Sequence, residues 1–265
     1  MNTEPADHSN QSTIFNRFAH HYAVSPVHRS GPDLAVLLKL AAPNPADVAL
    51  DVATGTGHTA LAVGATAAEV VGVDLSPEML AEARRLAAEE SRTNVRFVQA
   101  SAESLPFAAG TFSLVTARHA PHHFTSVEAF LSEVARVLRP TGRFVLADQV
   151  SPAIEDQPWI DQYETIRDPS HHRQRPPAAW RQLAQAAGLV LAEEQLVSYD
   201  LDFAWWTKQA GCTPQQVQHL EKLAQEAPTA TKARMDLKFD PSGHLQSHRM
   251  QVLVARYERR DGVTA

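Results

Sequence analysis

The stretch VALDVATGTGHTALAVGATAAEVVGVDL, residues 48–75, decides the fold. It holds two short apolar runs, Val48–Val52 and Val70–Val73, separated by a glycine turn and a helical pattern over 58–66. Two strands joined by a helix form a unit whose strands run parallel. The stretch therefore predicts an α/β protein whose sheet is covered by helices on both faces.

The pattern continues on the carboxyl side of this stretch. Ser76-Pro77 is typical of a helix start, and Thr125 and Glu128 have the spacing of a capping box before a helix over 126–138. Further strands are predicted at 95–98, 112–116 and 143–147. We expect a doubly wound, Rossmann-like sheet, mostly parallel, that binds its ligand beyond the carboxyl ends of the strands.

The second half of the chain is less regular. Helices are predicted over 154–167 and 177–187, a strand over 189–199, a helical insertion over about 203–245 and an antiparallel last strand over about 249–257. The expected organisation is an N-terminal tail and cap helix (1–30), a ligand-binding core (31–150) and a C-terminal half of the same domain (151–265).

Composition excludes several classes of protein. Among 265 residues, the formal net charge is -6, which disfavours a nucleic-acid partner. The single cysteine, Cys212, excludes a disulfide framework and a cysteine-rich metal site within one chain. The polar start at 1–10 differs from a secretory signal, and no apolar run approaches the roughly 18 residues of a membrane span. We expect a cytoplasmic protein without a membrane partner.

The glycine turn is the first candidate site. Gly55 and Gly57 let the backbone bend sharply and let a ligand approach closely. Asp74 ends the second strand, where its carboxylate can accept hydrogen bonds from a ribose. The same glycines also fit a loose dinucleotide fingerprint, so an NAD(P)-dependent oxidoreductase competes with an enzyme that uses S-adenosylmethionine.

Asp51 favours S-adenosylmethionine. A carboxylate just before the glycine turn would repel a pyrophosphate, whereas it attracts the ammonium and sulfonium of S-adenosylmethionine. The alternative, in which Asp51 only caps the following turn, stays open.

Four motifs in order carry a resemblance: LDVATGTGHTALAVG, VVGVDLSPEMLAEA, VRFVQASAESLPFAAGTFSLV and EVARVLRPTGRFVLAD. Together they resemble a class I S-adenosylmethionine-dependent methyltransferase, of the group related to the ubiquinone and menaquinone C-methyltransferases. The resemblance covers roughly 48–148. Outside it, ARHAPHHF (117–124) and RDPSHHR (167–173) are similar to a bacterial subgroup whose substrates are mostly unassigned.

This resemblance implies an enzyme that moves a methyl group by in-line displacement to oxygen or carbon of a small-molecule acceptor. Asp51 would hold the cofactor's ammonium and Asp74 its ribose. The residue before Ala102 is usually Asp, and here it is Ser101, a neutral and weaker partner for adenine. The remaining cofactor contacts implied are Tyr22, His28, Ala53, Thr54, Gly55, Gly57, Leu75, Met79, Ala102, Glu103, Arg118 and His119.

Histidines are the candidates for the chemical step. His119, His122 and His171 lie in the two histidine-rich segments, and imidazole titrates where it can deprotonate a phenol, enol or acidic carbon. The alternative is that His122 and His123 only cap and anchor the following helix. We expect no metal, because the spacing differs from that of zinc-binding helices. Segment 167–173 is interpreted either as a lid or as a solvated surface loop.

Other functions stay open on these residues. A protein could bind S-adenosylmethionine without methyl transfer, as a cyclase or a binding module. The sequence is compatible with a homo-oligomer.

Overall fold

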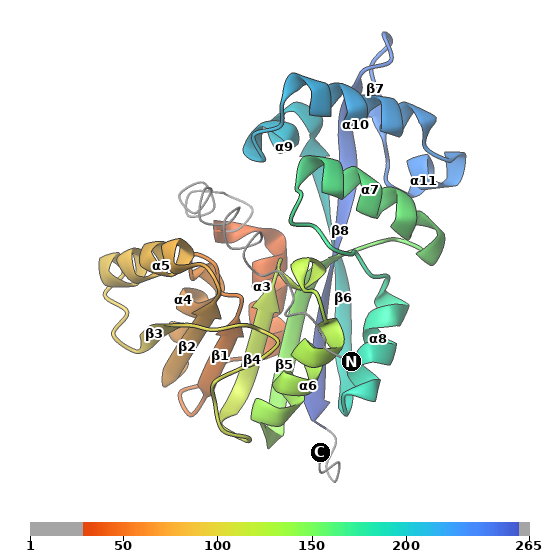
Figure 1. The fold of residues 1–265 in the computed structure, drawn as a ribbon. Helices are drawn as coiled ribbons and strands as arrows, with labels where there is room; N and C mark the ends of the chain where they lie inside the picture. Colours follow the sequence, from red (N-terminus) through yellow and green to blue (C-terminus); the bar gives the residue numbers. More distant parts are fainter. Residues whose placement is uncertain (1–28, 260–265) are drawn as a thin grey trace, which may run out of the picture.

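In the computed structural model, described over residues 29–259, one mixed sheet forms the centre of the protein (Figure 1). Its order is β3-β2-β1-β4-β5-β8-β6, with β7 paired to β8. The strands are β1 (Val48–Val52), β2 (Glu69–Asp74), β3 (Val95–Gln99), β4 (Phe112–Arg118), β5 (Leu138–Val150), β6 (Leu189–Asp202), β7 (Lys238–Phe239) and β8 (Leu245–Arg259). The first five run parallel and β8 is antiparallel to both its long neighbours. The predicted fold class is confirmed.

Helices cover both faces of the sheet. One face packs against α3, α4 and α5, and the other against α6 and α8. Alternate residues of each strand supply the two cores: Ala49 faces the first and Leu50 the second. The helices are α3 (Pro32–Ala41), α4 (His58–Gly64), α5 (Pro77–Glu89), α6 (Val127–Val137), α7 (Gln157–Arg167), α8 (Pro177–Ala186), α9 (Phe203–Gln209), α10 (Pro214–Glu226) and α11 (Thr229–Arg234), with 3-10 turns η1 (Pro121–His123) and η2 (Ile154–Asp156).

Helix α5 shows how local sequence sets these elements. Ser76 accepts a hydrogen bond from the Met79 N–H (3.0 Å), and Pro77 begins the helix. Leu80 and Ala83 then recur at helical spacing on the buried side. The cap of α5 therefore follows the last residue of β2 by two positions, and the Ser76 N–H donates back to Asp74.

Three details of the sequence prediction are wrong. Helix α6 is capped by Ser126, which accepts from the Ala129 N–H, and not by Thr125 in a capping box with Glu128. The Ser126 N–H instead donates to Glu103 (2.8 Å), so an acid distant in sequence completes the cap. The last strand begins at Leu245 rather than near 249, and β5 is longer than 143–147.

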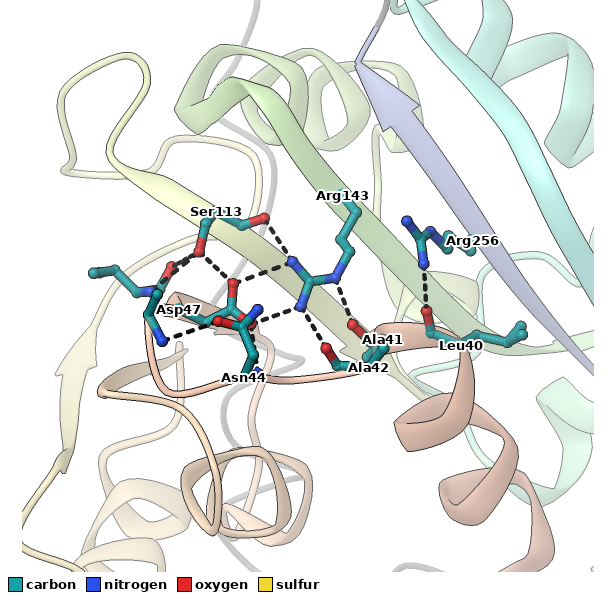
Figure 2. Close-up of polar contacts among 10 residues, drawn as sticks. Leu40, Ala41, Ala42, Asn44, Asp47, Ser113, Arg143 and Arg256 are labelled. Atoms are coloured by element: carbon teal, nitrogen blue, oxygen red, sulfur yellow. Dashed lines mark hydrogen bonds and ion pairs between the residues drawn. The ribbon is translucent and has the colours of Figure 1, made fainter.

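Arg143 links the end of α3 to the side of the sheet where the parallel strands begin (Figure 2). Its guanidinium donates to the Ala41 and Ala42 carbonyls at the end of α3 and to Asp47, with Nη2 2.6 Å from Oδ2. Ser113 also donates to Asp47 (2.7 Å). This cluster satisfies the helix-end carbonyls and leaves the opposite, carboxyl edge for a site.

The longest strands, β6 and β8, extend past the others to α7, α9, α10 and α11 (Figure 1). Helices α9 to α11 lie between β6 and β8, where the sequence predicts the helical insertion. Among residues 29–259, no helix is both long enough and apolar enough to cross a membrane.

Candidate active site

The glycine turn follows β1, and every second residue of it has a left-handed backbone conformation. Ala53, Gly55 and Gly57 have φ of 53°, 52° and 85°. The Thr54 N–H donates to the Val73 carbonyl (2.8 Å), which ties the turn to β2. The bend brings the ends of β1 and β2 to one place on the carboxyl edge.

The two glycines serve different needs. A Cβ on Gly57 would crowd the Phe97 ring (3.0 Å) and the Ala83 Cβ (3.1 Å), and the left-handed φ of 85° also favours glycine here. A Cβ on Gly55 would meet nothing within 4 Å. The backbone at Gly55 therefore borders open space that can receive a ligand.

Asp74 joins the turn to the start of α5. Its carboxylate accepts from the Gly55 N–H (2.8 Å) and the Ser76 N–H (2.9 Å). Burial raises the pKa of this carboxyl despite these hydrogen bonds. Asp74 thus already orders the glycine turn.

Asp51 is 2% exposed at the end of β1. Its two oxygens accept from the Thr54 hydroxyl (2.6 Å) and the Thr116 hydroxyl (2.7 Å). Burial raises the pKa of Asp51 to about 6, although these bonds and the charge of Arg118 act in the opposite direction. Each carboxylate oxygen can accept a further hydrogen bond, so the group fits an incoming ammonium.

The residues expected around adenine follow β2 and β3. Met79 is 3% exposed in the first turn of α5, and the Leu75 carbonyl accepts from Gln99 (2.9 Å). The Ser101 hydroxyl accepts from the Glu103 N–H (3.2 Å). Glu103 itself points to the cap of α6, as described above. Over residues 29–259, the Ala102 N–H has no acceptor.

Arg118 and His119 follow β4 and converge on Asp33 of α3. Arg118 binds Asp33 through Nε (2.5 Å) and Nη2 (2.9 Å), and the His119 Nε2 lies 3.1 Å from the same carboxylate. The Tyr199 hydroxyl also donates to Asp33. Burial alone would raise the pKa of Asp33, but His119 and Arg118 hold it well below its ordinary value. His119 is also strained, with φ of 51°.

His122 and His123 form the 3-10 turn η1. The His122 Nδ1 lies 2.6 Å from Asp148 Oδ1 at the end of β5. The His123 Nδ1 contacts Ser170 through its carbonyl (3.0 Å) and its hydroxyl (3.1 Å). Burial lowers the pKa of His123 to about 3, and His122 acts in the same direction. Both rings are therefore held in place by other elements.

His171 completes the group from the segment after α7. Its Nε2 lies 2.9 Å from Asp161 Oδ1, and its ring centroid lies 5.8 Å from that of His122. His171 and Ser170 are 8% and 5% exposed, and the N–H groups of 172 and 173 donate to the His122 carbonyl. The segment packs on η1, which argues against a solvated surface loop.

The structure thus pairs each candidate histidine with an aspartate that the sequence analysis did not select. The partners are Asp33, Asp148 and Asp161. Asp148 could have been found, because like Asp51 it ends an apolar strand. The predicted contacts Tyr22 and His28 lie outside the described residues. Within 29–259, no group of three or more His, Cys, Asp or Glu residues could hold a metal ion.

Comparison with known proteins decides the family. Residues 50–146 match the family described as "Methyltransferase domain". The chain is 36% identical over 224 residues to the uncharacterized methyltransferase YcgJ of Bacillus subtilis (strain 168), covering 81% of this chain and 87% of that protein. The chain belongs to the class I S-adenosylmethionine-dependent methyltransferases. Its cofactor is S-adenosylmethionine, which confirms that prediction over the dinucleotide alternative.

Further matches agree with this assignment. The crystal structure of the YcgJ protein from Bacillus subtilis superposes with a TM-score of 0.84 at 30% identity, covering 87% of the methyltransferase and 99% of that chain. Demethylmenaquinone methyltransferase of Thermus thermophilus is 47% identical over 105 residues, covering 39% of the methyltransferase and 47% of that enzyme. The [4+2]-cyclase SpnF (TM-score 0.60, 20% identity, covering 86% and 81%) shares the fold alone.

Proposed function

We propose that the methyltransferase modifies oxygen or carbon of a small-molecule acceptor, which binds beside the histidines at the carboxyl ends of β4 and β5. One observation carries this proposal: three histidine–aspartate pairs, two of them buried and the third partly exposed at Asp161, lie at and beyond the carboxyl ends of β4 and β5. Imidazoles held by carboxylates suit proton removal from an acidic O–H or C–H group. Such an arrangement favours an enzyme over a protein that only binds the cofactor.

Cofactor binding is assigned to the turn after β1 and to the acid after β2. Asp51 binds the ammonium, because a cation beside this buried carboxylate relieves the cost of its ionisation. Gly55 leaves room beside the backbone, with Ala53, Thr54 and Gly57 shaping the turn. Asp74 accepts from the ribose hydroxyls while it holds the Gly55 N–H.

The adenine contacts are assigned to the ends of β2 and β3. Leu75 and Met79 supply the apolar contact. The free Ala102 N–H donates to the ring, and the Ser101 hydroxyl adds a neutral hydrogen bond. Glu103 acts indirectly, since its carboxylate is committed to the first turn of α6.

On the acceptor side, the chain has to exclude water, align the acceptor and remove a proton. S-adenosylmethionine, when bound, supplies an electrophilic methyl group. Arg118 and His119, locked to Asp33, form the wall between the cofactor residues and the acceptor. His122 is a base candidate. His171 contacts the acceptor, and the cationic Arg167 and Arg173 favour an acceptor with negative charge.

The test is a product assay with the full chain. S-adenosylmethionine is incubated with panels of phenols, enols and activated carbon acids, and S-adenosylhomocysteine and the methylated acceptor are quantified by mass spectrometry. We expect both products in equal amounts with at least one panel. Binding of S-adenosylmethionine without either product, across all panels, would instead support a cyclase or binding protein. A parallel titration with NADH controls for nucleotide binding of low specificity.

A further inference from the structure

The His122–Asp148 pair differs from the other two histidine–aspartate pairs in the hydrogen-bond partners of its carboxylate. His122 and Asp148 are 4% and 0% exposed, and 2.6 Å separates Nδ1 from Oδ1. Asp148 Oδ2 has no hydrogen-bond partner among residues 29–259. The carboxylate of Asp33, in contrast, is already occupied by Arg118 and Tyr199. Asp161 likewise accepts from the Gln174 N–H and from Gln157 as well as facing His171. Of the three carboxylates, Asp148 is therefore the one with an oxygen that has no other partner within the described residues.

The second ring nitrogen of His122 is available. Within the described part of the chain, Nε2 makes no hydrogen bond. The backbone of His122 is meanwhile clamped, because its carbonyl accepts from the N–H groups of His172 (3.0 Å) and Arg173 (2.9 Å). The backbone is fixed by these bonds and the ring is oriented by its contact with Asp148, so Nε2 is the ring atom that a ligand could meet.

Burial determines how many protons the His122–Asp148 pair holds at a given pH. It raises the pKa of Asp148 to about 7 and lowers the pKa of His122 well below its ordinary value. Above about pH 7, a single proton lies on Nδ1, facing the carboxylate, and Nε2 keeps its lone pair. Below that pH, a second proton enters the pair, and Nε2 carries a hydrogen when both protons lie on the imidazole or when one lies on Asp148 Oδ1, facing Nδ1.

Other charged groups face this pair from each neighbouring element. They come from the residue after β4, from η1 itself, from the end of α7, and from the segment between α7 and α8: His119, His123, Arg167, Asp168, His171 and Arg175. Arg167 and Arg175 disfavour a positive charge on the pair, whereas Asp168 favours one. Substitution of one of these groups should shift the pH midpoint at which the pair takes up its second proton. The first proton should stay on Nδ1 above that midpoint.

We propose that Asp148 is a positioning residue that fixes the Nδ1–H form of His122, and that the acceptor is an enol or phenol whose O–H proton His122 Nε2 removes. This deepens the proposed function and rests on it. The O–H bond breaks, its electron pair stays on the acceptor oxygen, and the proton forms a bond to Nε2. Imidazole suits an enol or phenol, since most carbon acids need a stronger base.

The first experiment reads the tautomer without turnover. The full chain is labelled with ¹⁵N-histidine, and ring nitrogen shifts are followed by NMR between about pH 6 and pH 8, around the range where imidazole titrates. The signal of His122 is assigned by its loss in His122→Asn. We expect Nδ1–H with unprotonated Nε2 at the high end, and protonation of Nε2 with a midpoint near neutrality.

Asp148→Asn should remove that Nδ1–H preference, and Asp161→Asn is the matched control that leaves the His122 tautomer unchanged. In the product assay, Asp148→Asn should lower kcat about 10²-fold and abolish the acid limb of the pH profile. The measurement on the unaltered chain decides the matter if a variant fails to fold. An Nε2–H tautomer at high pH, or a rate independent of pH, overturns the role of Asp148. The expected tautomer without product from any enol or phenol overturns the acceptor class alone.

Discussion

Lowering the pH should weaken S-adenosylmethionine binding through Asp51. This carboxyl is 2% exposed and accepts hydrogen bonds from the hydroxyls of Thr54 and Thr116. Those neutral donors leave its pKa at about 6. Only the ionised form attracts the cofactor's ammonium, so affinity falls as the pH drops through this value.

The magnitude follows from the pKa of about 6. Roughly nine-tenths of Asp51 is ionised at about pH 7 and roughly one-tenth at about pH 5, so the apparent Kd should rise about tenfold, or about 1.4 kcal/mol. The cofactor's amino group stays protonated throughout this range, since an α-amino group titrates at about 8. Binding near the midpoint should also release a proton, because the cation lowers the pKa of Asp51.

Isothermal titration calorimetry measures both quantities. The Kd is determined across the pH range, and repetition in buffers of different ionisation enthalpy counts the released protons. Asp51→Asn is the control: it should bind weakly with a flatter profile, and whatever slope remains belongs to Asp74, whose pKa is also raised. A native affinity that changes less than about twofold, or an Asp51→Asn variant that keeps the full slope, would exclude Asp51 as the titrating group.

Four further outcomes are expected. Asp74→Ala should abolish tight cofactor binding in calorimetry, because it loses the ribose acceptor and frees the Gly55 N–H together. Gly57→Ala should cost about 1–3 kcal/mol in urea unfolding, since its Cβ overlaps packed side chains at a φ of 85°. His119→Ala should lower turnover more than cofactor affinity, whereas His171→Ala should mainly raise the acceptor's KM; swapped effects in steady-state kinetics reject these roles. Arg143→Ala should lower the free energy of unfolding by about 3–5 kcal/mol, yet leave calorimetric cofactor affinity unchanged because it lies at the opposite edge.

The glycine turn and strand ends were predictable because their signals are local. A short apolar run, two glycines and an acid occupy consecutive positions, and parallel strands bring such ends to one edge. The cap of α6 was not predictable in the same way. Thr125 and Ser126 both suit a helix start, and the choice depends on Glu103, which arrives from another loop.

The histidine–aspartate pairs needed the tertiary structure. His122 and Asp148 are 26 residues apart, and they meet only because β4 and β5 are neighbours in register. Asp161 is ten residues before His171, but one lies within α7 and the other after it. Residue type alone could select the histidines, while the carboxylates that orient them had no distinguishing pattern.

The buried acids of this edge divide by the kind of partner they have. Asp33 meets a permanent cation in Arg118, and its pKa is held low, so it is ionised at every relevant pH and serves as a fixed anchor. Asp51 accepts from the hydroxyls of Thr54 and Thr116 and Asp148 faces His122, and burial raises the pKa values of the two acids to about 6 and about 7. The ionised form of such an acid is stabilised when a positive charge arrives. For Asp51 that charge is the cofactor's ammonium, and for Asp148 it is the proton that His122 would take from the acceptor. β4 lies between β1 and β5, so Arg118 and His119 lie between these two acids. Cofactor binding and proton removal would then each bring a positive charge to the carboxyl edge of the sheet, one after the other.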